Sequence, residues 1–195
     1  MLKDIQIIGN GFQKPSFELL PESVDRLHAC HYFCSQVQRY STLKDETKAR
    51  WYLRAALSGF RSTLDSLDGE IKIKLKKNLW RESKQEQDIN KDVLVKMLTK
   101  IRNYAIHSSR ISGKVIDYSI TIIDDKGGRT EDVRSLFFDE LNRKDNFRDA
   151  SNVSDEEIKW FNRQAQAWPA DLLIKEGLYQ ASTYLHHFCV KHGIA

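Results

Sequence analysis

The residues best suited to chemistry lie in the stretch 101–107, at the end of an amphipathic segment that begins at Asp92. Its polar members include Arg102, Asn103 and His107. An arginine guanidinium holds a phosphate through a planar set of donors, and a histidine transfers protons near neutral pH. Together these side chains could cleave RNA without a metal ion.

Helix geometry determines which of these side chains can act together. Asn103 and His107 are four residues apart and share one face of a helix. Arg102 is five residues from His107, which separates them by about 140° on a helix with ~3.6 residues per turn. A long arginine side chain, or a second copy of the chain across a dimer axis, must close that gap. A surface arginine and a helix-terminal histidine bound to carbonyls would have the same spacing, so that alternative stays open.

The same Arg-x4-His spacing also occurs at Arg26 and His31, so spacing alone does not identify a site. This second pair falls inside a predicted helix, and its histidine belongs to an apolar stripe. The stripe consists of Val24, Leu27, His31 and Cys34. We therefore predict that His31 is a core or half-buried histidine. His107 differs because it falls where a helix ends, and the helix dipole favours a protonated imidazole there.

The six residues Arg102-Asn103-Tyr104-Ala105-Ile106-His107 resemble the Arg-polar-x3-His form of the Arg-x4–6-His motif of the HEPN superfamily. These helical domains are found in prokaryotic toxins, in abortive-infection and CRISPR-associated ribonucleases, and in related eukaryotic nucleases. Helix order and size extend the resemblance loosely over most of the chain. It implies a mainly α, up-and-down helical bundle whose Arg102, Asn103 and His107, from two protomers, line one cleft. It also makes Asp65, in an earlier helix, a candidate acidic support for the motif.

The function implied by this resemblance is metal-independent RNA cleavage by a homodimer, as a toxin or phage-defence effector. Attack by the 2′-hydroxyl would leave a 2′,3′-cyclic phosphate and a 5′-hydroxyl. We expect no cofactor and no metal, and an antitoxin or another regulatory partner is compatible with this reading. Many HEPN relatives keep the fold and have lost the chemistry. A non-catalytic protein-binding or nucleotide-binding module is therefore the alternative.

Length and composition limit the number of domains, the class of partner and the cellular compartment. A chain of 195 residues predicts one domain, 1–195, with 30% charged and 41% hydrophobic residues. The net charge of +4 permits a nucleic-acid partner without requiring one. Three cysteines, an odd number, argue against a disulfide framework and predict a reducing cytoplasm. We expect no membrane segment, because no apolar run approaches the ~18 residues that span a bilayer.

Ahead of the motif the sequence predicts two long helices. The first begins at Pro21, which suits a first helical position, and ends near Tyr40. Ser41 and Thr42 are predicted to cap the second helix. Its apolar stripe contains Leu53, Ala56, Leu57, Phe60, Leu64 and Leu67. Close approach by a neighbouring helix is allowed by the small residues Ala55, Ala56, Ser58 and Gly59.

The segment before the motif helix is predicted to be interrupted. Asp68 and Gly69 predict a break or a kink. The alternation in residues 71–77 fits either a strand or a helix, and we favour a helix that ends near Trp80. The polar residues 83–90 predict a loop, from which Asn90 caps the motif helix.

After the motif the pattern changes to that of strands. Residues 115–123 are rich in β-branched side chains, residues 124–128 form a turn with two glycines, and residues 129–138 can return as a second strand. This predicts a β-hairpin insertion at about 115–138. Two further helices are predicted, one capped by Ser154 and the last beginning at Pro169.

A dense basic run surrounds Trp80. Lysine contacts to phosphate and stacking on an aromatic side chain are typical of proteins that hold unpaired RNA. The predicted RNA-binding residues are Lys72, Lys74, Lys76, Lys77, Trp80 and Arg81. The alternative is a solvated helix face with Trp80 in the core.

Cysteines and histidines gather near both ends of the helical part of the chain. The two groups are Cys30, His31 and Cys34, and His186, His187, Cys189 and His192. Neither group contains a second close pair of the kind found in zinc fingers. Buried thiols and half-buried histidines are the favoured interpretation, so we predict no metal site.

Overall fold

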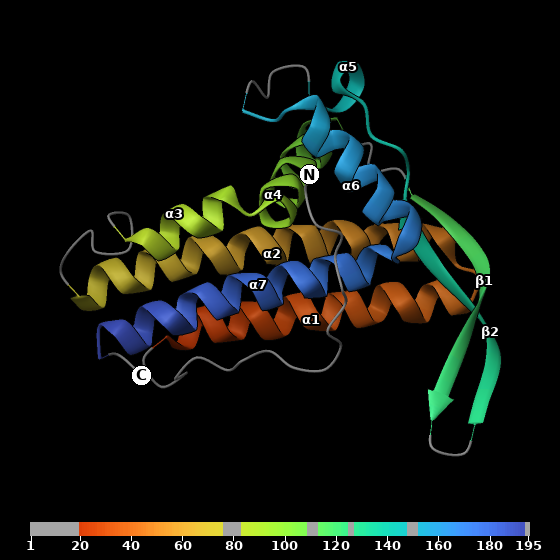
Figure 1. Ribbon diagram of the computed structural model, residues 1–195, viewed down its shortest axis with the longest axis horizontal. Helices are drawn as coiled ribbons and strands as arrows, with labels where there is room; N and C mark the ends of the chain where they lie inside the picture. The colour runs from red at the N-terminus through yellow and green to blue at the C-terminus, as the bar shows by residue number, and fades with distance from the viewer. Residues whose placement is uncertain (1–19, 76–82, 109–112, 125–126, 148–151, 194–195) are drawn as a thin grey trace.

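The computed structural model describes residues 20–75, 83–108, 113–124, 127–147 and 152–193 (Figure 1). These residues form seven helices and one antiparallel pair of strands. In chain order the elements are α1 (Pro21–Thr42), α2 (Glu46–Leu75), α3 (Lys84–Lys91), α4 (Val93–Ser108), β1 (Gly113–Asp124), β2 (Gly127–Phe138), α5 (Arg143–Asn146), α6 (Asp155–Ala167) and α7 (Ala170–Lys191). The prediction of a mainly α fold with an inserted β-hairpin is confirmed.

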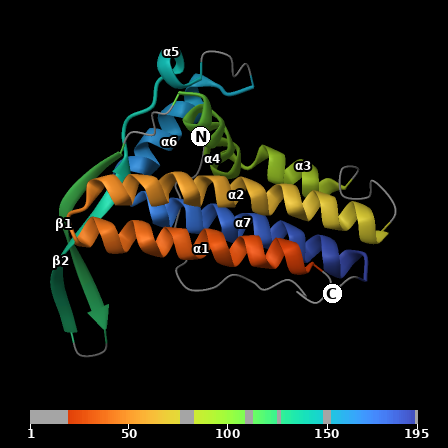
Figure 2. The same cartoon turned by 180° about the vertical axis from the view of Figure 1, so that it is seen from behind.

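Helices α1, α2 and α7 lie side by side and form the long axis of the molecule (Figures 1 and 2). Helices α2 and α7 run in one direction and α1 runs in the other. Helix α4 packs across α2 and α7, and α6 packs against α4. The central core is built from large side chains of these helices, among them Phe60, Met97, Leu98, Phe161 and Leu173.

The contact between α1 and α2 is close because small residues line it. A Cβ atom added to Gly59 would lie 3.1 Å from Cβ and 3.2 Å from Cα of Cys30. The Sγ atom of Cys30 donates a hydrogen bond of 3.2 Å to the carbonyl of Ala56. The predicted close approach of a neighbouring helix is therefore confirmed for Ala56 and Gly59.

The first turn of α1 is capped by a residue of α2. Leu20 stands at the N-cap position and has no side-chain oxygen to offer. The carboxylate of Glu70 instead accepts hydrogen bonds from the backbone N–H groups of Glu22 and Ser23, at 3.0 and 2.9 Å, and from the Ser23 hydroxyl. Because these N–H groups would otherwise lack partners, Glu70 joins the two helices by satisfying them.

The predicted cap of α2 is wrong. Ser41 and Thr42 belong to the last turn of α1, where their hydroxyls donate to carbonyls four residues earlier. That local bond is the usual alternative to capping for Ser and Thr. Asp45 caps α2 instead, accepting a hydrogen bond of 3.0 Å from the N–H of Lys48. Hydrogen bonds from Lys48 also lower the pKa of Asp45.

Two other boundaries differ from the prediction. Helix α2 continues through Asp68 and Gly69 to Leu75, because one helical glycine costs only about 1 kcal/mol and the neighbouring Ile71 is buried in the core. Residues 84–91 form α3 rather than a loop, since Ile89 packs among side chains of α7. Residues 76–82, into which the predicted helix near Trp80 extends, lie outside the described part.

The predicted hairpin is confirmed. β1 and β2 pair from Gly113 opposite Phe138 to Asp124 opposite Gly127. At its base, Leu136 and Phe138 are buried in the central core. The helix predicted after Ser154 is also present, with a complete capping box at its start, and the last predicted helix corresponds to α7.

Candidate functional site

Helix α4, which carries the motif, is anchored by one apolar face. Its buried residues are Leu94, Val95, Met97, Leu98 and Ile101. Asp92 caps the helix by accepting a 3.0 Å hydrogen bond from the N–H of Val95, so the predicted cap at Asn90 is wrong. Burial raises the pKa of Asp92 despite that hydrogen bond. The predicted motif helix is confirmed, and it ends one residue after His107.

Arg102 and Asn103 form a hydrogen-bonded pair on this helix. The Nη1 atom of Arg102 donates to Oδ1 of Asn103 at 3.1 Å. Arg102 is half-buried and Asn103 is exposed. The Nε atom of Arg102 is buried and has no hydrogen-bond partner among the described residues. The pair therefore presents an amide at the surface, held by a cation that lies partly beneath it.

The third motif residue is placed only through its backbone. Position 107 lies in the last turn of α4, and the side chain of His107 lies outside the described part of the structure. Regular helix geometry places positions 103 and 107 on one face and turns position 102 about 140° away from position 107. The joint action of Arg102 and His107 therefore stays a prediction.

The second Arg-x4-His pair has different surroundings. Arg26 and His31 are both exposed on α1, so the predicted burial of His31 is wrong. The buried stripe of α1 passes beside that position, through Leu27, Cys30 and Cys34. Neighbouring groups still shield part of the imidazole from water, and this desolvation, followed by repulsion from Lys175 and His28, lowers the pKa of His31.

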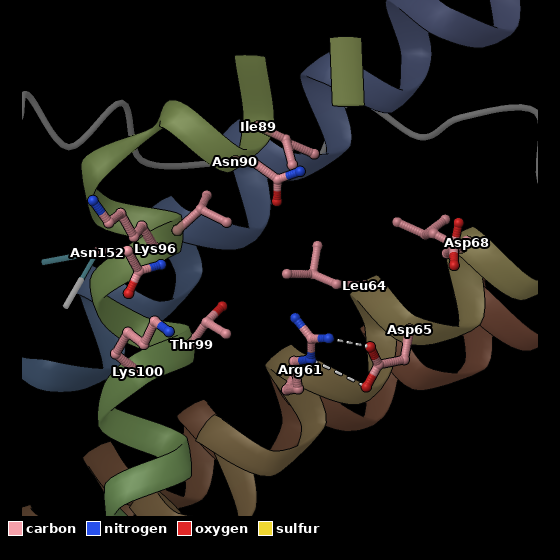
Figure 3. Close-up of a pocket in the computed structure, with 12 residues that line it drawn as sticks. Arg61, Leu64, Asp65, Asp68, Ile89, Asn90, Lys96, Thr99, Lys100 and Asn152 are labelled. Carbon is pink, nitrogen blue, oxygen red and sulfur yellow. Dashed lines mark hydrogen bonds and ion pairs between the residues drawn. The ribbon is translucent and has the colours of Figure 1, made fainter. Parts of the chain in front are cut away.

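A polar cleft of about 530 Å³ lies between α2 and the motif helix (Figure 3). The α2 wall carries Arg61, Asp65 and Asp68, and the α4 wall carries Lys96, Thr99 and Lys100. The last residues of α3 and Asn152 complete its rim. This volume lies within the ~300–1,000 Å³ range of small-molecule sites.

Ion pairs fix two of the three cations in the cleft. Nη2 of Arg61 lies 2.7 Å from Oδ1 of Asp65, within α2. Nζ of Lys96 lies 2.8 Å from Oε1 of Glu157, in α6. Lys100 has no ion-pair partner among the described residues. Burial acts to raise the pKa of Glu157, but hydrogen bonds from Lys96 and from the N–H of Ser154 bring it below its ordinary value.

The cleft and the motif lie on the same stripe of α4. Asn103 follows Lys96, Thr99 and Lys100 by seven, four and three residues, which are the spacings of helix neighbours. The sequence prediction missed this cleft, although two lysines four residues apart on the polar face of α4 hinted at it. Asp65, the predicted acidic support of the motif, lines the cleft and pairs with Arg61.

Most residues of the predicted RNA-binding run lie outside the described part of the structure or lack a described side chain. Lys72 is exposed on α2, and Lys74 lies in α2 without a described side chain. The remaining members, Lys76, Lys77, Trp80 and Arg81, lie outside the described residues. This surface stays a prediction.

The cysteines of the chain are buried thiols. Cys30, Cys34 and Cys189 are free and buried. A hydrogen bond with Cys30, together with burial, raises the pKa of the Cys34 thiol. Within the described residues, no group of three or more His, Cys, Asp or Glu side chains could hold a metal ion.

Comparison with known proteins gives no match, so the functional interpretation rests on the geometry of the site. No family model, no curated protein and no solved structure matches this chain. Among the helices that the structure describes, none combines the length and apolar character required to cross a membrane.

Proposed function

We propose that this protein is a metal-independent endoribonuclease of HEPN type, acting in the cytoplasm as a toxin or a phage-defence effector. The observation that carries the proposal is the Arg102–Asn103 hydrogen bond on the motif helix. It holds a permanent cation beside an exposed amide, one turn before position 107 on a helix whose other face is packed in the core. The polar cleft on the same stripe offers room for substrate next to the motif.

The proposed reaction is an internal transesterification of RNA. His107 acts as the general base or as the general acid. The base removes the proton of a 2′-hydroxyl, whose oxygen forms a bond to the adjacent phosphorus. The bond from phosphorus to the 5′-oxygen breaks, and that oxygen takes a proton from a general acid. Arg102 holds the phosphate and stabilises the charge that develops on it, and Asn103 orients the phosphate or His107. The products are a 2′,3′-cyclic phosphate and a 5′-hydroxyl.

The proposed active form is a homodimer. One helix separates positions 102 and 107 by about 140°, and a second copy related by a two-fold axis would supply the missing group. Light scattering should therefore give twice the chain mass. Cross-linking through a cysteine introduced at Asn103 should join two chains, and a strictly monomeric active protein would exclude the composite site.

The chemistry is tested by matched histidine variants in an assay with mixed RNA and excess EDTA. His107→Ala should lower cleavage by ~10²–10⁴-fold, the usual contribution of a general acid or base. Arg102→Ala should lower it strongly as well. His31→Ala is the matched control, because it also removes a helical histidine five residues after an arginine. Full activity of a folded His107→Ala protein would remove His107 from the chemistry, and wild-type activity abolished by EDTA would reject the metal-free mechanism.

A non-catalytic binding module is the second candidate. The observation in its favour is that Arg61 and Lys96, in the cleft, are already held by carboxylates. In that case expression would not arrest growth, or His107→Ala would not relieve the arrest. A regulatory partner such as an antitoxin would be sought by co-purification with the wild-type protein.

A further inference from the structure

The two walls of the cleft between α2 and α4 differ in charge. Lys96, Thr99 and Lys100 line it from α4, and Arg61, Asp65 and Asp68 line it from α2, where Arg61 is paired with Asp65 (Figure 3). A ligand that spans the cleft therefore meets hydrogen-bond donors and positive charge at α4. At α2 it meets two carboxylates, of which Asp65 holds Arg61 and keeps further acceptor sites, because an ionised carboxylate has about four. This arrangement selects a molecule with an anionic end and an end that carries hydrogen-bond donors.

Between the walls the cleft is apolar. Leu64 and Leu67 of α2, Ile89 of α3 and Val95 of α4 contribute to its lining. Three of these side chains, Leu67, Ile89 and Val95, are at most 5% exposed and form a fixed floor, whereas Leu64 is half-buried. The exposed part of Leu64 offers apolar area to the flat face of a ring, which gains from removal of that area from water.

The charges show which group can bind the anionic end. Arg61 is held by Asp65 and Lys96 by Glu157, whereas Lys100 has no ion-pair partner within the described residues. The ammonium group of Lys100 is thus the cation available to a phosphate. It stands three residues before Asn103, on the side of the cleft nearest the motif.

We propose that this cleft binds one unpaired nucleotide of the RNA, with its phosphate against Lys100 and its base directed toward Asp65 and Asp68. The assignment of the nucleotide to RNA rests on the proposed function. Carboxylates accept hydrogen bonds from the exocyclic amino group of cytosine. Uracil has a carbonyl at that position, which the carboxylates repel. The site therefore prefers cytosine over uracil next to the cleaved bond.

Titration of the full chain with mononucleotides tests the site separately from catalysis, because a mononucleotide has no internucleotide bond to cleave. The probes are 5′-CMP, 5′-UMP and inorganic phosphate, measured by calorimetry. We expect 5′-CMP to bind about tenfold more tightly than 5′-UMP, a ratio within reach of a base-edge hydrogen bond. Lys100→Gln should weaken both nucleotides by about tenfold, since it removes a charge-assisted contact to phosphate.

Two further variants sharpen the test. The double variant Asp65→Asn, Asp68→Asn should bring the affinities for 5′-CMP and 5′-UMP together, because an amide can also donate to the uracil carbonyl. Lys48→Gln removes the same charge from the exposed start of α2 and should change neither affinity. Equal binding of 5′-CMP by Lys100→Gln and wild type, or no binding of 5′-CMP to the wild type, would reject the cleft as a nucleotide site.

The outcome separates this inference from the proposed nuclease. RNA cleavage that needs His107, without binding of 5′-CMP, would keep the nuclease and reject the cleft site. Binding of 5′-CMP that needs Lys100, without any RNA cleavage, would do the reverse. A cytosine hexanucleotide that fails to displace bound 5′-CMP would show that the ligand is a free nucleotide, and would overturn its assignment to RNA.

Discussion

The two sides of helix α2 differ in function: one packs closely against α1, and the other lines the cleft. Toward α1 the helix presents Ala56 and Gly59, which let the two backbones approach closely, and Glu70, which caps the neighbouring helix. Toward α4 it presents Asp65 and Asp68, which line an open cleft. Asp68 follows Gly59 by nine residues, about 180° around the helix at ~100° per residue.

This difference separates stability from binding within one element. Groups on the α1 side are buried and satisfied by protein partners, so their removal should destabilise the fold. Groups on the cleft side are exposed or half-buried, and their interactions are ones that water can replace. Four predictions test this division, from the largest expected effect to the smallest.

Glu70→Ala should have the largest effect on stability. It leaves two backbone N–H groups of α1, those of Glu22 and Ser23, without their acceptor. We expect a loss of about 2–3 kcal/mol in the free energy of unfolding, in line with the penalty for unsatisfied buried donors. Urea unfolding measures it. Asp65→Ala on the cleft side is the control and should change stability by less than about 1 kcal/mol; equal losses in the two variants would contradict the division.

The two glycines of α2 offer a matched test of the closed side. Gly69 has open space where a Cβ would be placed, so Gly69→Ala should stabilise the protein by up to about 1 kcal/mol through helix propensity. Gly59→Ala would press on the backbone of Cys30 and should be less stable than Gly69→Ala by about 1–2 kcal/mol. Thermal unfolding of both variants side by side gives the difference. Equal stabilisation would mean that α1 can move away at no cost.

Glu157→Gln tests the polar pair that holds the far wall of the cleft. The pKa of Glu157 is lower in the folded protein than its ordinary value, because hydrogen bonds from Lys96 and Ser154 outweigh its burial. Its stabilising contribution is therefore present above the unfolded pKa of about 4.3 and is lost as the pH falls through the folded pKa. We expect Glu157→Gln to lose about 1 kcal/mol at pH 7 and to match the wild type in strong acid. Urea unfolding at several pH values measures this. If the charge of Glu157 were irrelevant, the difference in unfolding free energy between wild type and Glu157→Gln would not change with pH.

Local signals were sufficient for the elements that depend on local chemistry. The β-branched run before two glycines predicted the hairpin, and Ser154 predicted the start of α6. The caps at Asp45 and Asp92 were missed, because a competing polar residue lay two or three positions away. Only the geometry of the folded chain decides between such neighbours.

Features that depend on packing between distant segments could not be predicted from the sequence. The short helix α3 has an almost wholly polar sequence and is held through Ile89, which meets α7. The exposure of His31 depends on which edge of α1 faces α2 and α7. The cleft depends on how α2 and α4 pack in the folded chain, and the spacing of Arg102, Asn103 and His107 contains no information about that packing.

Lys100→Gln should have the smallest effect on stability, and a favourable one. Lys96 and Lys100 are four residues apart on α4, and like charges at this spacing destabilise a helix by about 0.2–0.5 kcal/mol. Glutamine has nearly the same helix propensity as lysine, so removal of the charge should raise the free energy of unfolding by that small amount. The gain should shrink as added salt screens the repulsion, which urea unfolding at low and high ionic strength can follow. A loss of more than about 1 kcal/mol would exceed the usual range for surface substitutions. Such a loss would make Lys100 a structural residue. A small gain would instead show that Lys100 costs stability, as expected for a cation whose role is to bind an anion.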